Sequence, residues 1–265
     1  MPQLSIITIN LNNKEGLQKT IESVISQTYT DFEYLIIDGG SNDGSDHVIK
    51  QYANKLTYWV SEPDKGIYNA MNKGIQKAHG EYCLFLNSGD SLFDSNVLQN
   101  VFSTKHMEDL LYGDIVMGED NTSTLKVCPD KLTFEFLLYD YVPHQCVFFK
   151  RELFRKIGLY NENLKIVSDD EFFILAVTHY NCSYTHLPFT ISIFNRDGIS
   201  SNPQYQNLIK QEREAFFRKH FSFMLDEYKE LIAARHELQN LKTSKFFKYG
   251  FRWSHLIKQK LHKFI

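Results

Sequence analysis

Three aspartates in this chain of 265 residues stand where an apolar run gives way to a polar loop or a helix. Asp38 follows five apolar or aromatic positions within 32–37, Asp90 closes the loop 87–90, and Asp169 opens a helical pattern. A carboxylate at a tight turn can accept hydrogen bonds from ribose hydroxyls or from the N–H of a uracil-type base. A loop carboxylate can bind a hard divalent cation, and one beside a reacting hydroxyl can take its proton.

Polar loops close three of the predicted strands. They lie at Thr8–Asn10, at 38–44 and at 87–90. One loop of Gly, Asn and Asp is usually a plain turn. The carboxyl ends of parallel strands, however, meet at one edge of a sheet, where ligands bind. Three such loops together therefore predict a ligand site.

The elements that must position these loops alternate through the first hundred residues. Apolar runs at 4–9, 32–38, 56–60 and 82–86 predict strands, and apolar residues recur between them at helical spacing. This alternation is typical of βαβ units. We therefore expect an α/β fold with a Rossmann-like, mostly parallel central sheet flanked by helices.

The rhythm changes after about residue 110. Strands are predicted at 110–112, 146–149 and 183–187, with helices at 132–138 and 169–179. Residues 204 to about 241 are helical in pattern and highly charged. We expect one domain over 1–203, in two halves (about 1–110 and about 111–203), and a helical extension over 204–265.

The loop at Asp38 has the features of a nucleotide site. Gly39 and Gly40 let the backbone approach a ligand closely. The loop lacks the GxGxxG pattern that cradles a dinucleotide, so nicotinamide binding is disfavoured.

The loop 87–90 favours a metal. Mg²⁺ or Mn²⁺ commonly keeps several waters and binds substrate phosphates, so the single carboxylate of Asp90 is sufficient. The cation would neutralise charge on a departing diphosphate.

Four blocks in this order resemble the family-2 glycosyltransferases of the GT-A type: SIIT at 5–8, IIDGGSNDGS at 36–45, residues 61–90, and VSD at 167–169. The third block reads SEPDKGIYNAMNKGI over 61–75 and ends in FLNSGD at 85–90. Their order and spacing are specific, and the resemblance covers roughly residues 4–201. It implies inverting transfer of a sugar from a nucleoside diphosphate sugar, with Mn²⁺ or Mg²⁺ as cofactor. It also implies that 1–203 is a catalytic domain, with a nucleotide-sugar binding half (about 1–110) and an acceptor-side half (about 111–203).

The resemblance also implies roles for particular residues. The metal motif of the family is commonly Asp-x-Asp, and Asn87 replaces its first aspartate here, which leaves Asp90 as the metal ligand. Donor-binding positions are implied at Thr8, Asn10, Asp38, Gly39, Asp64, Asn87 and Ser88.

Inversion requires a general base, and the resemblance places it at Asp169. Asp170 is the rival because it is the next carboxylate along the chain. A simpler alternative is that Ser168 or Asp169 caps the helix, as such residues often do. Capping does not exclude a free carboxylate oxygen.

Further residues border the acceptor or the diphosphate in similar enzymes. His144 and Gln145 precede a strand at the acceptor site, although a lone histidine is more often structural. Arg196 and Lys65 are candidate phosphate partners or plain surface charges. The remaining positions are Tyr112 and Asp114, which would line the cleft, and Ser200, in a loop that would close over the diphosphate.

The charge is distributed unevenly. Residues 242–265 carry seven Lys or Arg and no acid, which leaves the first 241 residues near −10. The tail also holds six Phe, Tyr or Trp residues, which is typical of an interfacial amphipathic helix. The alternative is a helix that packs on the body. Nucleic acid is disfavoured because the acidic body would repel it.

Compartment and partners follow from these features. Four dispersed cysteines suit a reducing compartment, and we expect neither a signal peptide nor a membrane span. The predicted location is cytoplasmic and peripheral on the inner membrane face. The predicted acceptor is a saccharide or polyprenyl-linked saccharide in surface polysaccharide assembly.

Two other functions remain open from the residues alone. A nucleotidyltransferase would need a Gly-rich, basic loop after the first strand, where residues 10–13 read NLNN. A nucleotide-sugar binding or scaffolding protein without catalysis would not need all of Asp38, Asp90 and Asp169.

Overall fold

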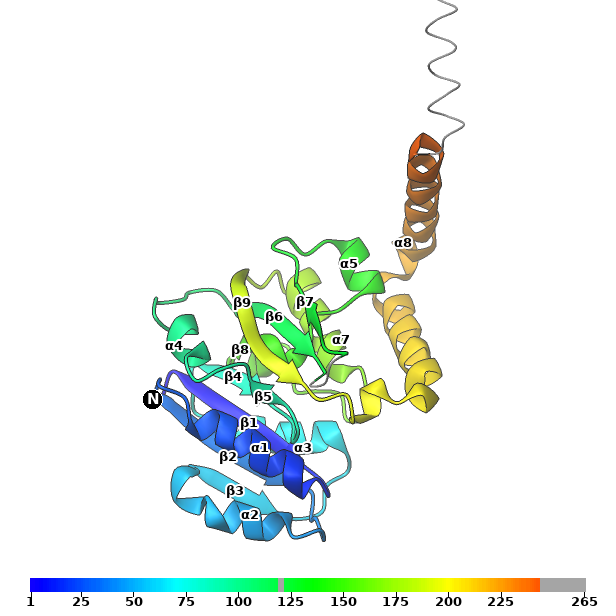
Figure 1. Ribbon diagram of the computed structural model, residues 1–265. Coiled ribbons are helices and arrows are strands. Elements are labelled where there is room, and N and C mark those ends of the chain that lie inside the picture. Colours follow the sequence, from blue (N-terminus) through cyan, green and yellow to red (C-terminus); the bar gives the residue numbers. More distant parts are fainter. Residues whose placement is uncertain (119–121, 244–265) are drawn as a thin grey trace, which may run out of the picture. The chain divides into compact units, whose positions relative to one another are not determined.

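Four parallel strands form the first half of the sheet in the computed structural model, which describes residues 1–118 and 122–243 (Figure 1). β1 (Leu4–Asn10) lies between β2 (Phe32–Asp38) and β4 (Tyr82–Phe85), and β3 (Tyr58–Ser61) pairs with β2. β1 is buried along its whole length, as expected of a strand covered on both faces. The predicted Rossmann-like α/β fold is confirmed.

The second half of the sheet joins the first through an antiparallel pair. β8 (Val147–Lys150) runs antiparallel to β4 and to β6 (Leu110–Met117), and β9 (Tyr184–Phe194) lies parallel to β6. Two short strands, β5 (Ser91–Leu92) and β7 (Thr124–Lys126), pair with β9 and β6. The order along the sheet is β3-β2-β1-β4-β8-β6-β9-β5.

Helices flank the sheet, and α1 crosses in front of β1 and β2 in Figure 1. α1 (Lys14–Ile25) begins at Asn13, whose side chain accepts the N–H of Gly16. α3 (Ile67–Lys77) packs against β1 and β2. The remaining helical segments are α2 (Ser45–Gln51), α4 (Val97–Val101), α5 (Phe134–Tyr139), α6 (Leu153–Lys156), α7 (Ser168–Thr178), α8 (Gln206–Thr243) and the short 3-10 turns η1 (Ala53–Lys55), η2 (His144–Cys146), η3 (Ile199–Ser201) and η4 (Pro203–Tyr205).

A cluster of aromatic rings fixes the start of α7 to the sheet. Phe172 of α7 stacks on Phe154 of α6 with ring centroids 4.6 Å apart. Tyr160 meets Phe172 edge to face at 5.4 Å, and Phe85 of β4 meets Tyr160 in the same way at 5.5 Å. Packed aromatic pairs of this kind stabilise a core beyond the area they bury. The cluster therefore ties the helix that carries Asp169 to the strand that leads to Asp90.

The chain divides into two compact units, residues 1–213 and 214–265. The predicted domain boundary at residue 203 falls inside the first unit. α8 contributes to both units, and its backbone is non-helical at Phe221. Among the residues described, none of the helices combines the length and the apolar composition that crossing a bilayer requires. Apart from the backbone of its first two residues, the predicted basic tail at 242–265 lies outside the described residues.

Candidate active site

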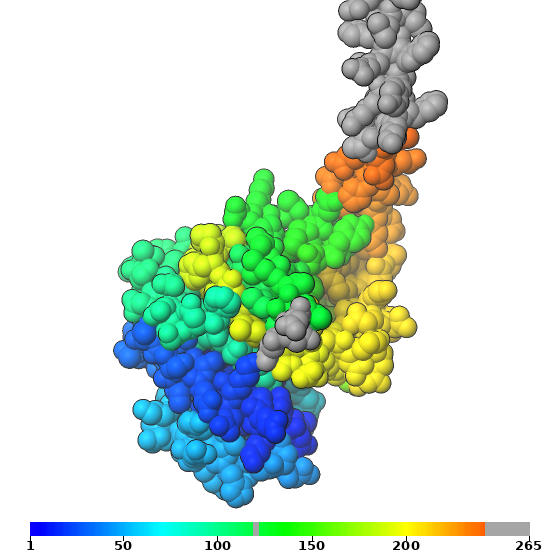
Figure 2. Space-filling view, viewed as in Figure 1, coloured from blue at the N-terminus to red at the C-terminus, as the bar shows by residue number. Residues whose placement is uncertain are grey.

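A cavity of about 800 Å³ opens at the carboxyl ends of the parallel strands. Residues from both halves of the sheet line it. In Figure 2 the corresponding stretches of the chain cover different parts of the surface, blue to cyan and green to yellow. Its size falls in the usual range for small-molecule sites. The predicted site residues that line it are Asn10, Asp64, Asn87, Ser88, Asp90, His144, Gln145, Asp169 and Ser200.

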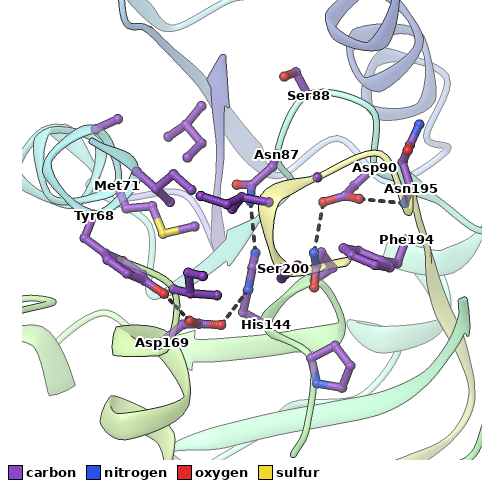
Figure 3. A pocket seen from close by; sticks show the side chains of 18 of the residues that line it. Tyr68, Met71, Asn87, Ser88, Asp90, His144, Asp169, Phe194, Asn195 and Ser200 are labelled. Carbon is purple, nitrogen blue, oxygen red and sulfur yellow. Dashed lines mark hydrogen bonds and ion pairs between the residues drawn. The ribbon is translucent and has the colours of Figure 1, made fainter. Parts of the chain in front are cut away.

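Asp169 lies in the first turn of α7, and its carboxylate faces Tyr68 and His144 (Figure 3). The Tyr68 hydroxyl donates to Oδ1 at 2.6 Å, and His144 Nδ1 lies 2.8 Å from Oδ2. Burial alone would raise the pKa of Asp169, but the charge and hydrogen bond of His144 and the bond from Tyr68 together lower it. The side chain keeps 17% of its surface exposed. Each carboxylate oxygen has two lone pairs, so a substrate hydroxyl can still be bound.

Asp170 is held differently, although it also borders the cavity. Its carboxylate forms an ion pair with Arg213. The same guanidinium donates to the carbonyls of Leu137 and Asp140 at 2.8 and 3.1 Å. Asp170 is thus engaged in a structural clamp between α5, α7 and the start of α8. This favours Asp169 as the carboxylate available to a substrate.

Capping does not consume either residue at the start of α7. The residue at the N-cap position is Val167, and its side chain makes no capping hydrogen bond. The Ser168 hydroxyl instead accepts the backbone N–H of Asn161 at 2.6 Å. The alternative that Ser168 or Asp169 merely caps the helix is therefore not what the structure has.

Asp90 lies across the cavity, just after β4, and is 3% exposed. Oδ1 accepts the backbone N–H of Asn195 at 2.9 Å, and Oδ2 accepts Nε2 of Gln145 at 3.0 Å. Burial raises the pKa of Asp90 to about 6, and these two bonds and the charge of His144 offset only part of that effect. Positive charge placed beside this carboxylate would be stabilising.

His144 links the two sides of the cavity. Its Nε2 lies 3.3 Å from Nδ2 of Asn87, so Tyr68, Asp169, His144 and Asn87 form one chain in Figure 3. Burial alone would lower the pKa of His144, but the charge and hydrogen bond of Asp169 outweigh it and raise the pKa. His144 borders the cavity as predicted, and Gln145 binds Asp90 directly.

Asp38 joins the ends of β1 and β3 to the loop after β2 and does not itself line the cavity. Its fully buried carboxylate accepts Nδ2 of Asn10 and the hydroxyls of Ser41 and Ser61, each at 2.6 Å. Burial alone would raise the pKa of Asp38, but these hydrogen bonds lower it. Asn10 lines the cavity beside it. The contact of Asp38 with a nucleotide stays a prediction.

Gly39 provides the space that Asp64 occupies. A Cβ atom at Gly39 would lie 2.5 Å from Oδ2 of Asp64, which is closer than such atoms approach in proteins. Asp64 also accepts the backbone N–H of Gly66 at 2.8 Å. The absence of a side chain at residue 39 thus allows the Asp64 carboxylate to take the position that it has at the cavity wall.

Thr8 and Tyr112 lie in the interior rather than on the cavity wall. Thr8 Oγ1 is 3.0 Å from the hydroxyl of Tyr34. The Tyr112 hydroxyl donates to the carbonyl of Pro129 at 2.7 Å. Both side chains support the strands that end at the site.

Asp114 and Arg196 also do not line the cavity. Asp114 is buried and lies 2.9 Å from Nε2 of His186. Arg196 donates to Oγ1 of Thr124 at 3.2 Å. Lys65 is exposed beside the cavity-lining Asp64. The roles proposed for these residues from the sequence stay predictions.

Sequence reasoning missed two groups in the site, Tyr68 and Asn195. The available signal for Tyr68 was its place inside the block that carries the family resemblance. Its burial, which makes a hydrogen-bond partner for the hydroxyl necessary, is visible only in the structure. Asn195 acts through its backbone N–H, which no residue type reveals.

The sequence of residues 5–158 matches the family model described as glycosyl transferase family 2. The chain belongs to this family. A PGL/p-HBAD biosynthesis glycosyltransferase of Mycobacterium bovis is 32% identical over 208 residues, which cover 76% of this chain and 80% of that protein. An uncharacterised glycosyltransferase of Mycobacterium tuberculosis is 33% identical over 209 residues, covering 76% of this chain and 78% of that one. The protein is a glycosyltransferase.

Solved structures share the fold at low sequence identity. S. aureus TarS in complex with UDP-GlcNAc has a TM-score of 0.67 at 18% identity, covering 92% of this chain and 75% of that one. Another TarS structure covers 73% of this chain, which spans only 60% of that one. The mannosyltransferase PcManGT of Pyrobaculum calidifontis, in complex with GDP-Man and Mn²⁺, has a TM-score of 0.57 at 14% identity, covering 94% and 82%.

Proposed function

We propose that this glycosyltransferase moves a sugar from a nucleoside diphosphate sugar to a saccharide or lipid-linked saccharide, with inversion of the configuration at the anomeric carbon. The observation that carries the proposal is the pair of carboxylates in one cavity. The pKa of Asp90 is raised to about 6 by burial, whereas the pKa of Asp169 is lowered by His144 and Tyr68 despite burial. Environments that move the pKa values of two carboxyl groups apart in this way are typical of groups with different catalytic roles.

The donor side is the end of the cavity formed by Asn10, Asp64, Asn87 and Ser88. Buried Oδ1 of Asn10 has no hydrogen-bond partner among the described residues, and an unpaired buried acceptor is costly until a ligand donor fills it. A nucleotide N–H or hydroxyl would meet that need. Similar folds with UDP-GlcNAc and with GDP-Man support a nucleoside diphosphate sugar as donor.

The residues present fit a divalent cation. Asp90 supplies a buried carboxylate whose raised pKa favours a neighbouring positive charge, and Mg²⁺ or Mn²⁺ would complete its oxygen ligands from diphosphate and water. When bound, the cation would stabilise negative charge on the leaving nucleoside diphosphate. PcManGT contains Mn²⁺ in a similar fold.

The transfer step requires one proton acceptor from the chain. The acceptor hydroxyl oxygen attacks the anomeric carbon as the bond from that carbon to the diphosphate oxygen breaks. The proton of the hydroxyl passes to Asp169, whose carboxylate faces the cavity. The electron pair of the broken bond leaves with the nucleoside diphosphate.

Surface polysaccharide assembly at the inner membrane face is the proposed setting. It is supported by the basic aromatic composition of residues 242–265, because anionic leaflets attract such segments. The acceptor would then reach the enzyme on a lipid carrier.

The test of this function is the variant Asp169→Asn with a panel of UDP- and GDP-sugars. We expect the native chain to release nucleotide in the presence of Mn²⁺. Asp169→Asn should retain donor binding and fold, but lose on the order of 10²–10⁴ in turnover, the usual contribution of a positioned base. Asp170→Asn is the matched neighbour. If it is the inactive variant while Asp169→Asn turns over normally, the assignment of the base is wrong.

A further inference from the structure

The position of the Asp169 carboxylate in the cavity depends on its hydrogen-bond partners. Its two oxygens are fixed by partners from different elements, Tyr68 of α3 and His144 of η2. The tyrosine is 4% exposed, and 14% of the histidine side chain is exposed. Buried hydrogen bonds to a charged group hold geometry more firmly than exposed ones.

The other ring nitrogen of His144 reaches the donor side. Nε2 lies 3.3 Å from the Asn87 amide nitrogen, while buried Oδ1 of Asn87 has no partner among the described residues. An amide can present either its nitrogen or its oxygen after rotation by half a turn. Asn87 can therefore donate its N–H to Nε2 of a neutral imidazole, or accept the Nε2–H of a doubly protonated imidazole through its oxygen. An aspartate at this position could only accept.

We propose that His144 is a positioning residue for sugar transfer, which holds the Asp169 carboxylate with Nδ1–H and couples it through Nε2 to Asn87 of the donor loop. The proposal rests on the proposed function, in which Asp169 is the base. In either protonation state that Asn87 accommodates, the proton on Nδ1 remains. His144 thus acts on the reaction through Asp169 and does not itself accept the substrate proton.

Two substitutions of His144 distinguish the role of Nδ1 from the role of Nε2. His144→Asn places an amide nitrogen near the position of Nδ1 and keeps a donor to Asp169, whereas His144→Gln reaches toward Nε2 and abandons Asp169. We expect His144→Gln to lower turnover on the order of 10²-fold, the usual cost of a misplaced reacting group. His144→Asn should retain turnover within about tenfold of the native value. The assay is nucleotide release from whichever UDP- or GDP-sugar of the panel the native full-length chain turns over fastest with Mn²⁺.

The pH dependence of the transfer rate gives a second test, because replacing a purely structural histidine would not shift it. The charged groups and tyrosines whose fields reach Asp169 are His144, Tyr68, Tyr141, Tyr160 and Arg213, and neighbouring Asp170 is paired with Arg213. Removing the imidazole in His144→Asn removes the largest influence that lowers the pKa of Asp169. The acidic limb of the rate profile should therefore shift to higher pH, while it stays in place if His144 only fills space.

A substrate-free measurement tests the same proposal independently of turnover. In the native protein with ¹⁵N-labelled histidine, Nδ1 of His144 should carry a proton at pH 7, and its signal is identified by its loss in His144→Asn. An unprotonated Nδ1 at pH 7 would overturn the proposal, as would full turnover in His144→Gln. Failure of the proposed function looks different, since Asp169→Asn would then be active whatever the state of His144.

Discussion

At the scale of single residues, the site depends on two carboxylates with opposite surroundings. Asp90 and Asp169 could both be proposed from the sequence, because Asp90 closes a polar loop after a strand and Asp169 opens a helical pattern. Their partners could not be identified. The Asp169–His144 contact joins residues 25 apart, and the Asn195–Asp90 contact joins residues 105 apart. The inward orientation of Asp38 could not be predicted either, because a fully paired carboxylate and a ligand-binding one follow a strand in the same way.

Asp90 provides a prediction for the metal-free protein. Its folded pKa of about 6 lies above the ordinary value of 3.8. The folded state therefore binds more protons between these values, and stability falls as pH rises through them. Asp90→Asn should remove that penalty at pH 7 and stabilise the protein in EDTA by roughly 1–3 kcal/mol, the equivalent of one to two pKa units. The measurement is urea unfolding with and without Mn²⁺ and UDP.

The same variant should lose transfer activity and any additional stabilisation by Mn²⁺ with UDP. If Mn²⁺ with UDP stabilises Asp90→Asn as much as the native chain, then Asp90 is not the metal ligand. Full activity of the native chain in EDTA would contradict metal dependence altogether.

At the scale of elements, the parallel half of the sheet could be predicted because each strand is a short apolar run bounded by turn residues. β5 and β7 were not predicted, since strands of two and three residues carry too little pattern. β9 was predicted only over 183–187 but runs to Phe194, because its second part pairs with β6 across a register shift. The kink at Phe221 in α8 was not predicted either, and no glycine or proline marks it.

The Arg213 clamp yields a prediction about the stability of the fold. Arg213 pairs with Asp170 and bonds the carbonyls at the end of α5, with only 18% and 11% of the two side chains exposed. Arg213→Met should leave a buried charge without its partner and destabilise the fold by about 3 kcal/mol. The matched control is Arg218→Met, whose side chain is 56% exposed in its pair with Glu214, and which should cost less than about 1 kcal/mol. Equal losses in unfolding free energy for the two variants would mean that the clamp is not a structural contact.

At the scale of the whole molecule, chemistry and charge are separated along the chain. All residues that line the cavity precede residue 214, and they belong to one compact unit. The basic aromatic segment 242–265 follows at the other end of the sequence. An enzyme whose acceptor is held in a membrane gains from such a separation, because attachment and catalysis can then vary independently.

This separation predicts the effect of removing the segment. A chain truncated after Leu241 should remain folded and bind nucleotide, because the candidate donor-site residues all lie before residue 202. Its binding to vesicles of anionic lipid should be weaker than that of the full chain. Full-length binding should decline as salt rises, because screening shortens the reach of the seven cations. Replacing these cations with glutamine is the matched control, since it keeps the aromatic residues and removes only the charge. Equal vesicle binding by the full and truncated chains would contradict membrane attachment, and loss of folding on truncation would show instead that the aromatic residues of this segment pack against the rest of the protein.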